Sequence, residues 1–374
     1  LRIDPPLEPG RADAGGASAG RANAGHANAG GDSSSSDISS GASADRAPPP
    51  VPAATPYQIG VYYFPGWSPD QWSRWKLQVP FPERMPQLGF YREGDPEVMD
   101  WHIRWAVENG ISFFLFDWYW QDGRIALERG LHEGFLQAHH QGLLKFAVMW
   151  ANHDPFAAHT EEQLLLVADF WTRNYFCRPN HLQIDGRPAV FFFAPDNLSR
   201  DLQGAANVRK AFDALRARVR AAGFAGLWIG ACGPSDPGSK EALAQAGFDG
   251  VTAYNYPAAG SRGALRSPFA TYLDGQEQVW KGSTGGPIPY IPLLGVGWDS
   301  RPWHGAAAVA RTSRTAAGVA AGLRSLKAHL DRTGGRMAIL EAWNELGEGS
   351  DLEPTVAHGF GLREAVRTVF ATGP

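Results

Sequence analysis

Eight short apolar runs, separated by segments with helical periodicity, constrain this chain more than any other feature of its sequence. Each run is five to seven residues long and nearly free of charge. The runs lie at 58–64, 111–117, 145–150, 189–193, 227–231, 250–254, 290–294 and 337–343. Strands that are apolar along their whole length are typical of parallel sheets with both faces covered. The pattern therefore predicts eight parallel strands.

Helices of ten or more residues are expected between these strands. The predicted helices cover 96–109, 131–141, 160–174 and 207–222, and four more begin after Ser239, Ser267, Thr312 and Phe360. Eight βα units in about 320 residues match a (β/α)8 TIM barrel of the α/β class. An open doubly wound sheet would instead be marked by a glycine-rich phosphate turn after the first strand, where this chain reads YYFPGWSP.

Residues 1–54 differ in composition from the rest of the chain. They are rich in Ala, Gly and Ser and end in the proline-rich segment RAPPPVPAATP. Such a segment cannot bury enough apolar surface to offset its ordering entropy, so we expect a disordered linker with a stiffer end. The barrel then occupies 55–374 as a single catalytic domain. Because long tethers of this kind commonly carry enzyme bodies, we expect a secreted, periplasmic or cell-surface-anchored protein.

The composition also excludes several classes of protein. A formal net charge of -4 provides no basic field, so no nucleic-acid partner is expected. No apolar stretch is long enough for a transmembrane helix. Cys177 and Cys232 can form at most one bridge, and two unpaired thiols is the favoured reading. No metal-ligand spacing is present, so we expect no bound metal, and we expect no cofactor. We also expect the protein to be a monomer.

Aromatic side chains stand beside carboxylates and amides at the carboxyl ends of the predicted strands, where TIM barrels place their active sites. These residues are Tyr62, Tyr63, Trp67, Asp117, Trp118, Tyr119, Trp120, Trp150, Asn152, His153, Tyr254, Asn255, Trp298, Asp299, Arg301, Trp343 and Asn344. Aromatic faces stack on the apolar faces of sugar rings, while the polar groups bind sugar hydroxyls. The set predicts a carbohydrate-binding cleft. For any single aromatic, simple closure of the barrel top remains an equal alternative.

The segment EAWNELGEGSDLEP supplies the candidate catalytic groups. Strand alternation predicts that Glu341, Trp343 and Glu345 face the barrel lumen. Glu345 would emerge at the rim, and Glu348 follows it by three residues. Glycosidic cleavage needs two carboxyl groups, one protonated and one ionised, so Glu345 and Glu348 are the predicted catalytic pair. Asp117 is the chief rival for a catalytic carboxylate.

The other acidic residues of this segment, and two histidines elsewhere in the chain, have expected structural roles. Glu341 would be a buried carboxylate that supports the pair. Asp351 would be solvated or form a turn, and Glu353, held extended before a proline, would close the loop. His139 and His140 would lie on the surface.

At these residues the chain resembles a known family. WNELGEGSDLEP is similar to the W-N-E-W-x-E-G-x-x-x-E-P block of glycoside hydrolase family 99 and the wider WbsX-like group of polysaccharide proteins. YYFPGW, VMWANHD and the long segment LGFYREGDPEVMDWHIRWAVENGISFFLFDWYW resemble other blocks of that group, and IDGRPAVFFF and GWDSRPW also fit. The resemblance spans about residues 57–371.

The resemblance implies a (β/α)8 barrel and hydrolysis with retention and without a metal. Glu345 would deprotonate the 2-hydroxyl of the sugar to give a 1,2-anhydro intermediate, and Glu348 would act as general acid and then as base. This chain has Gly347 where family 99 has His, Leu346 where it has Trp, and His153 where the wider group has Glu. These departures leave the pair in place and leave the sugar unassigned.

The expected function is therefore that of a glycoside hydrolase that cleaves within a polysaccharide or oligosaccharide. Two alternatives stay open. A WbsX-type glycosyltransferase for polysaccharide biosynthesis would need a phosphate cradle or a metal-binding carboxylate pair for its donor. A non-catalytic glycan-binding barrel would depend on the aromatic residues and not on the glutamates.

Overall fold

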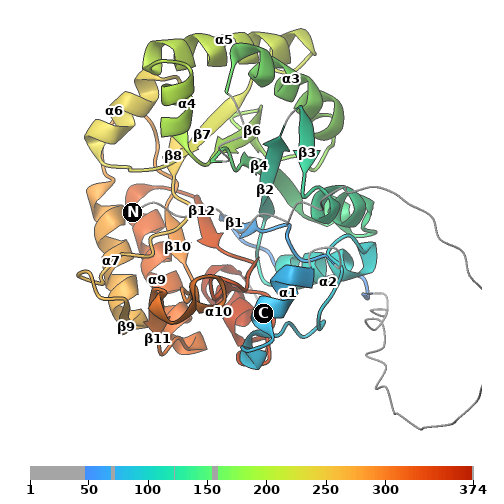
Figure 1. The fold of residues 1–374 in the computed structure, drawn as a ribbon, viewed down its shortest axis with the longest axis vertical. Coiled ribbons are helices and arrows are strands. Elements are labelled where there is room, and N and C mark those ends of the chain that lie inside the picture. Colours follow the sequence, from blue (N-terminus) through green and yellow to red (C-terminus); the bar gives the residue numbers. More distant parts are fainter. Residues whose placement is uncertain (1–46, 69–71, 122, 154–158, 373–374) are drawn as a thin grey trace, which may run out of the picture. The chain divides into compact units, whose positions relative to one another are not determined.

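The computed structural model describes residues 47–68, 72–121, 123–153 and 159–372. Eight parallel strands form the central sheet of the barrel (Figure 1). They are β1 (Gln58–Tyr63), β2 (Phe113–Gln121), β4 (Lys145–Trp150), β6 (Arg187–Phe192), β7 (Trp228–Cys232), β8 (Gly250–Thr252), β10 (Leu293–Gly295) and β12 (Met337–Glu341). Each overlaps one predicted apolar run, which confirms the predicted fold.

The strand order around the barrel is β10-β12-β1-β2-β4-β6-β7-β8. The gap between β8 and β10 is narrowed by a parallel bridge between Val251 and Tyr290. There the amide of Val251 donates to the carbonyl of Pro289 at 3.0 Å, and the amide of Ile291 donates to the carbonyl of Val251 at 2.8 Å. The eight strands therefore form a nearly closed barrel whose carboxyl ends all meet on one side.

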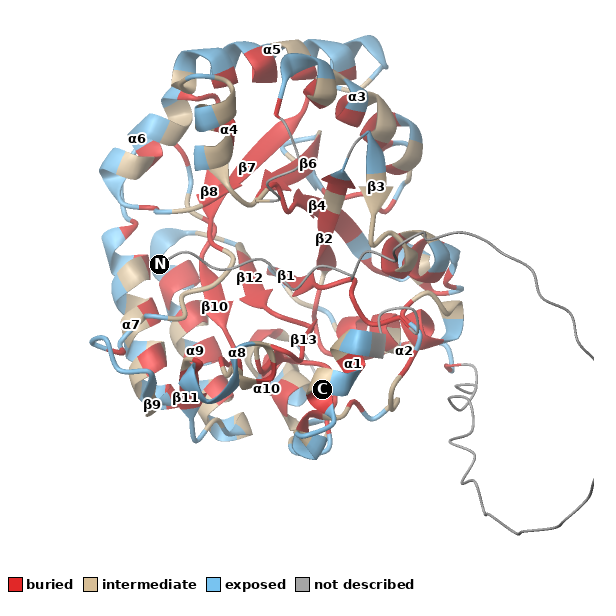
Figure 2. Ribbon diagram, viewed as in Figure 1, coloured by how far each residue is buried: buried red, intermediate tan, exposed pale blue. Residues whose placement is uncertain are grey.

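Helices cover the outside of the barrel and bury one face each (Figure 2). They are α2 (Pro96–Val107), α3 (Glu161–Trp171), α5 (Ala205–Ala221), α6 (Pro237–Gln245), α7 (Phe269–Gly282), α9 (Ala316–Thr333) and α10 (Gly361–Phe370), with the shorter α1 (Trp72–Gln78), α4 (Pro195–Asp201) and α8 (Arg301–His304). The Thr160 hydroxyl caps α3 by accepting from the amide of Gln163. Thr160 is the first residue of the helix predicted at 160–174.

The helix predicted at 131–141 is not a regular α-helix. The chain there forms a π turn at Gly130–Gly134 and a 3-10 turn at Phe135–Gln137. The two glycines of the π turn lower the helix propensity of the segment. The Gly134 position also lies against the backbone carbonyl of Glu93, so a side chain would not fit there. The βα unit is thus completed by turns in place of a helix.

The loops contain short additional strands. β3 (Arg124–Ala126) pairs with β2, β5 (Gln183–Ile184) with β6, β9 (Arg266–Pro268) with β11 (Ala310–Thr312), and β13 (Asn344–Glu345) with β14 (Ser350–Asp351). The last two pairs lie in loops that follow the final three barrel strands. They build the part of the barrel rim described below.

The buried side chains form two layers, one inside the lumen of the barrel and one between the strands and the helices. Tyr62, Leu115, Met149, Phe191 and Ile339 pack together in the lumen. A larger cluster joins the outer faces of the strands to the helices. Because side chains alternate along a strand, neighbours in sequence belong to different layers. This alternation decides which aromatic residues can reach a ligand.

The predicted linker is described only in part. Residues 1–46 lie outside the described residues, whereas 47–54 lie along the barrel. The amide of Ala53 donates to Val107, and the carbonyl of Ala54 accepts from Thr372, both at 2.8 Å. His140, expected on the surface, is instead buried, with Nε2 3.2 Å from the carbonyl of Ala47. The barrel therefore includes these eight residues of the predicted linker.

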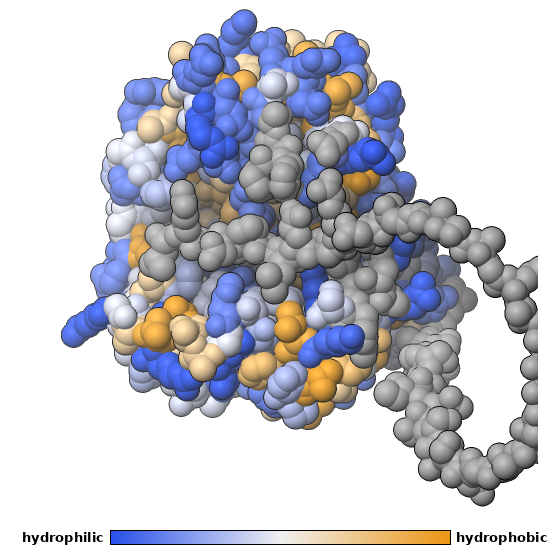
Figure 3. Space-filling view, viewed as in Figure 1, coloured by the Kyte–Doolittle hydropathy of each residue, from blue (hydrophilic) through white to orange (hydrophobic). Residues whose placement is uncertain are grey.

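Hydrophilic side chains cover most of the face visible in Figure 3. Large hydrophobic side chains that remain exposed, such as Val51, Leu166 and Val356, are scattered along the chain. Within the described ranges, no helix combines the length and the apolar character that a bilayer span requires.

Candidate active site

The segment after β12 folds back on itself as a tight hairpin. β13 and β14 pair antiparallel, with Asn344 opposite Asp351 and Glu345 opposite Ser350. The turn is closed by the amide of Glu348, which donates to the carbonyl of Glu345 at 3.1 Å. Gly349 has a φ of 64°, a left-handed conformation that glycine adopts without steric cost. One hairpin therefore presents both predicted catalytic glutamates.

Glu345 is buried and shares a tyrosine hydroxyl with Asp117. The hydroxyl of Tyr254, just after β8, lies 2.5 Å from Oε1 of Glu345 and 3.0 Å from Oδ2 of Asp117 on β2. A phenol carries one proton, so it can donate to only one of the two carboxyl groups. The other carboxyl group must be protonated to complete the second hydrogen bond.

Electrostatics indicate which carboxyl group holds that proton. Burial, followed by the charge of Glu345, raises the pKa of Asp117 well above its ordinary value. Burial raises the pKa of Glu345 to about 7, against the opposing effects of the Tyr254 hydrogen bond and the charge of Arg74. Asp117 is thus the group that keeps its proton to higher pH, and Tyr254 donates to Glu345 once that carboxyl group ionises.

The environment of Glu348, beside this pair, favours its protonated form. Burial, then the charges of Glu345 and Glu341, raise the pKa of Glu348 well above its ordinary value, while a hydrogen bond with Asn255 opposes them. Its Oε2 is buried and has no hydrogen-bond partner among the described residues. A buried carboxyl oxygen without a protein partner is available to a ligand.

The acids around the pair have structural partners. Glu341 is fully buried, and its Oε2 accepts from the hydroxyl of Ser350 at 3.0 Å, in keeping with the supporting role predicted for it. Asp351 is also buried and pairs with Arg314 at 3.0 Å. That pair corrects the expectation that Asp351 is solvated.

Glu353 does more than close the loop. Its carboxylate accepts from the hydroxyl of Tyr91 at 3.0 Å and lies 3.0 Å from Nε2 of His102. Nδ1 of that histidine hydrogen-bonds to the hydroxyl of Tyr63 at 3.1 Å. Glu353 thereby ties the loop after β12 to α2 and β1.

Five of the predicted ligand-binding aromatics face the helices and not the lumen, which corrects their predicted role. They are Tyr63, Trp118, Trp120, Trp150 and Trp343. The indole of Trp118 donates to the Tyr175 hydroxyl at 2.9 Å, and the indole of Trp120 donates to Gln163 at 3.1 Å. Alternation along β1, β2 and β4 sends these side chains outward.

The predicted ligand-binding role of Trp343 is wrong for a different reason. The predicted strand 337–343 ends as β12 at Glu341, so the alternation that would bring Trp343 inward stops two residues earlier. Its ring packs against Phe114, with centroids 5.2 Å apart, and against His102. Strand ends are the least certain part of a sequence pattern.

Three further predicted binding residues brace loops. The side chain of Asn344 bonds both the amide and the carbonyl of Phe64, at 2.8 and 3.0 Å. Asn152 bonds the backbone of Ala194 in the same way. The indole of Trp67 donates to the carbonyl of Asn344 at 2.8 Å. Their polar groups are already satisfied, so these residues shape the site without contacting a ligand through those groups.

Tyr62, Tyr119, His153, Asn255 and Tyr254 remain at the lumen. Tyr62 is fully buried beneath Tyr254, with ring centroids 4.8 Å apart, and supports that ring. Tyr119 is half-buried, and burial, then the charges of Asp117 and Glu345, raise its pKa. The His153 ring contacts Tyr119 and Phe193. These side chains form the aromatic and polar lining around the carboxyl groups.

Arg74 is a site residue that the sequence did not reveal. It lies on α1, a short helix absent from the prediction, and its charge lowers the pKa of both Glu345 and Tyr119. Nothing in the sequence pattern of the segment WSRWKLQ indicates that its arginine lies near the catalytic glutamates.

The structure also explains a departure from family 99. A Cβ at Gly347 would overlap the indole ring of Trp303. Trp303 in turn stacks on Trp67, with centroids 6.1 Å apart. Trp303 therefore occupies the space next to the hairpin that a histidine at position 347 would need.

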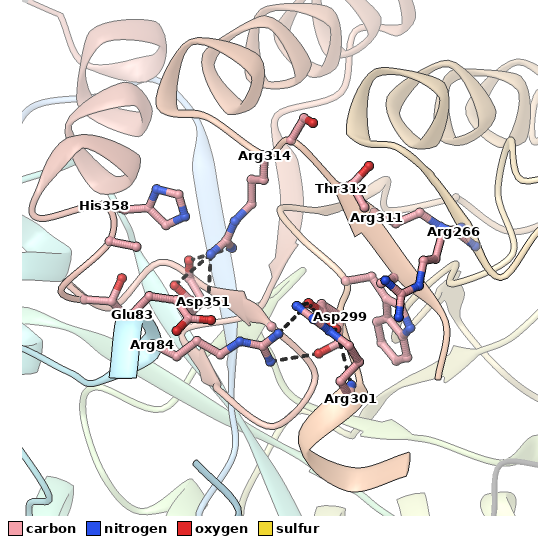
Figure 4. Close-up of a pocket in the computed structure, with 16 residues that line it drawn as sticks. Glu83, Arg84, Arg266, Asp299, Arg301, Arg311, Thr312, Arg314, Asp351 and His358 are labelled. Carbon is pink, nitrogen blue, oxygen red and sulfur yellow. Dashed lines mark hydrogen bonds and ion pairs between the residues drawn. The ribbon is translucent and has the colours of Figure 1, made fainter. Parts of the chain in front are cut away.

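Trp298, Asp299 and Arg301 belong to a separate cavity of about 290 Å³ between the loops after β10 and β12 (Figure 4). Asp299 pairs with Arg84 at 2.6 Å and with Arg301 at 2.5 Å.

Over the described residues, no cluster of three or more His, Cys, Asp or Glu could hold a metal ion. Cys177 is exposed, Cys232 is buried, and both are free thiols.

Comparison with known sequences identifies the family. A family model described as Glycosyltransferase WbsX matches residues 78–366. The chain belongs to this WbsX family. The WxcX protein of Xanthomonas campestris pv. campestris (strain B100) is 24% identical, over 87% of this chain and 51% of that protein. This WbsX chain thus spans about half the length of the curated relatives it matches.

Solved structures share the fold of this WbsX protein. A glycoside hydrolase-like protein aligns with a TM-score of 0.64 at 18% identity, covering 88% of this chain and 98% of that one. The GH99 endo-alpha-mannosidase from Bacteroides thetaiotaomicron aligns with a TM-score of 0.56 at 16% identity, covering 83% and 96%. The (β/α)8 barrel is therefore one that glycoside hydrolases also use.

Proposed function

We propose that this WbsX protein is a glycoside hydrolase that cleaves a polysaccharide or oligosaccharide internally. The observation that carries the proposal is one hairpin that presents two glutamates. Glu345 accepts a hydrogen bond from Tyr254, and Glu348 has a buried carboxyl oxygen without a hydrogen-bond partner among the described residues. Tyr254 favours the ionised form of Glu345, whereas burial and neighbouring charge raise the pKa of Glu348 well above its ordinary value and so favour its protonated form. Glycosidic cleavage requires one carboxyl group in each state.

The residues would divide the reaction between them. Glu348 donates its proton to the leaving oxygen as the glycosidic bond breaks. Glu345 removes the proton of the sugar's 2-hydroxyl, whose oxygen attacks the anomeric carbon to form a 1,2-anhydro sugar. Glu348, now ionised, accepts a proton from the water that opens this ring, and the 2-hydroxyl recovers its proton from Glu345. Each carboxyl group returns to its starting state, and configuration is retained.

A polysaccharide panel with mass detection of released oligosaccharides tests the proposal. We expect the wild-type protein to release products from at least one polysaccharide, and Glu345→Gln to release none from it. Glu162→Gln, which changes an exposed acid on α3, serves as the matched control. A panel without any released product, or full activity in Glu345→Gln, would remove the proposal.

A second candidate is a glycosyltransferase, which the description of the matching family favours. The same acid and base would then act on a nucleotide sugar, with a glycan hydroxyl as the acceptor. Transfer of a labelled sugar from a nucleotide donor to an oligosaccharide, without hydrolysis of the panel, would establish this candidate over the hydrolase.

We also propose that residues 1–46 serve as a tether for a barrel that works as a monomer outside the cytoplasm. The Ala, Gly and Ser composition of these residues supports the tether. Fractionation of cells that express the natural protein tests the compartment, and recovery in the cytosol alone would contradict it.

A further inference from the structure

The cavity beside the hairpin has a strong excess of positive charge. Five arginines line it, namely Arg84, Arg266, Arg301, Arg311 and Arg314, against three carboxylates, Glu83, Asp299 and Asp351. The whole chain, by contrast, has a net charge of -4. A concave surface with this local excess attracts anions.

Two of these arginines have no carboxylate partner within the described part of the chain. Arg311 is buried, and its guanidinium donates to the hydroxyl of Ser267 at 2.8 Å and to backbone carbonyls such as that of Pro257. Arg266 is exposed, on the strand paired with Arg311. Figure 4 shows both on one side of the cavity, with His358 on the other. Their charge is not neutralised by the protein.

Two buried donors that line the cavity also have no protein partner. Trp298 is 7% exposed, Thr355 is 1% exposed, and both line the cavity. Neither Nε1 of Trp298 nor Oγ1 of Thr355 has a hydrogen-bond partner among the described residues. A buried polar atom without a partner loses the hydrogen bond that it makes to water in the unfolded chain, which destabilises the folded state. Such atoms are expected where a ligand supplies the missing acceptor.

The place of the cavity in the fold agrees with its chemistry. It lies between the loops that follow the seventh and eighth barrel strands, β10 and β12. In TIM barrels these two loops frequently form a phosphate-binding site. A volume of about 290 Å³ is at the lower end of the range for small-molecule sites, so the cavity suits one sugar-sized or phosphate-sized group.

We propose that this cavity is an oxyanion-binding subsite, which takes a phosphate or carboxylate group carried by the saccharide ligand. Arg266 and Arg311 supply the uncompensated charge, and Trp298 and Thr355 supply the neutral donors. The statement that the anionic group belongs to a saccharide rests on the proposed function. The statement that the cavity binds an oxyanion rests on the residues of the cavity alone.

The cavity shares a wall with the candidate catalytic hairpin. The amide of Asp299 donates to the carbonyl of Glu348, and the next residue, Gly349, lines the cavity. An oxyanion bound there would place its saccharide next to the turn that carries Glu348. The protein would thereby select charged glycans over neutral ones.

Isothermal titration calorimetry with inorganic phosphate at low ionic strength tests the subsite. We expect saturable binding by the wild-type protein and a loss of about tenfold in affinity in Arg266→Gln and in Thr355→Val. Arg220→Gln, an exposed arginine on α5 outside the cavity, is the matched control and should bind phosphate like the wild type. Thr355→Val removes a hydroxyl without a protein partner, so its thermal stability should not fall.

The proposal is overturned by an absence of saturable phosphate binding in the wild type. It is also overturned if Arg266→Gln and Thr355→Val both bind phosphate as tightly as Arg220→Gln does. Because this experiment measures no turnover, its failure is distinct from failure of the hydrolase proposal.

Competition then identifies the source of the oxyanion. If a hexose phosphate or a hexuronic acid displaces inorganic phosphate better than uridine diphosphate does, the group belongs to the glycan, as proposed. The reverse order would assign the cavity to the diphosphate of a nucleotide sugar, overturn the glycan assignment and favour the transferase.

Discussion

A single tyrosine hydroxyl organises the protonation of the candidate site. Tyr254 bridges Asp117 and Glu345, and burial keeps the proton on the aspartate. The sequence indicated both carboxyl groups as candidates and treated Asp117 as a rival to the pair. The contact places Asp117 where it can orient Tyr254. No spacing in the sequence could have joined three residues from three different strand ends.

Replacement of Tyr254 by Phe should move the pH dependence of activity. The hydrogen bond from Tyr254 lowers the pKa of Glu345, so its loss raises that pKa above about 7. A base must be ionised to act, so the acidic limb of the profile of kcat/KM against pH should shift upward by about one pH unit. An unchanged acidic limb on an identified substrate would show that Glu345 is not the base.

Replacement of Glu341 by Gln should stabilise the protein, and more so at higher pH. Burial, then the charge of Glu345, raise the pKa of Glu341 well above its ordinary value. The folded state therefore keeps a proton that the unfolded state releases, and stability falls as pH rises between the two pKa values. Gln does not titrate and can still accept from Ser350.

Unfolding in urea measures this effect. The difference in unfolding free energy between Glu341→Gln and the wild type should grow by up to about 1.4 kcal/mol per pH unit from pH 5 to pH 8. A difference that stays constant over this range would mean that Glu341 is ionised in the folded protein.

At the scale of elements, the β13–β14 hairpin decides the geometry of the site. It was not predicted, because its strands are two residues long and its turn reads as an acidic loop. The eight barrel strands, in contrast, were predicted because each is a continuous apolar run. The predicted direction of the Trp343 side chain was wrong, because the strand pattern was extended past Glu341, where β12 ends.

Replacement of Gly347 by Ala tests the fit of this hairpin. The added Cβ would overlap the ring of Trp303, so either the turn or the indole must move. We expect a loss of activity of at least about tenfold, since displaced catalytic groups lose rate steeply. Far-UV circular dichroism should show an intact barrel. Gly142→Ala, at an open position on the surface, is the control.

At the scale of the whole molecule, composition and periodicity sufficed to predict the barrel and the side on which its site lies. They did not separate a ligand-binding tryptophan from one that packs against a helix, because both lie at strand ends. They also did not show that the loops after β10 and β12 enclose a cationic cavity. Its arginines come from segments far apart in the chain.

Two truncations test where the barrel begins. Removal of residues 1–46 should leave the melting temperature unchanged if they are only a tether. Removal of residues 1–54 also deletes the hydrogen bonds of Ala53 and Ala54 and the buried Ala47. We expect that deletion to cost roughly 1–3 kcal/mol. Equal melting temperatures for the two truncated proteins would place the boundary at 54.

The dependence of the rate on the leaving group tests whether Glu345 acts as the base and Glu348 as the acid. The measurement is kcat/KM of both glutamine variants on the natural glycan and on an aryl glycoside of the same sugar with an acidic phenol. An acidic leaving group departs without protonation, and kcat/KM covers only the steps up to cleavage of the glycosidic bond. The kcat/KM of Glu348→Gln should therefore fall about 100-fold or more on the glycan and stay close to that of the wild type on the aryl glycoside. Glu345→Gln should lose activity on both. Equal losses on both substrates in Glu348→Gln, or full activity in either variant, would show that the two glutamates do not act as acid and base.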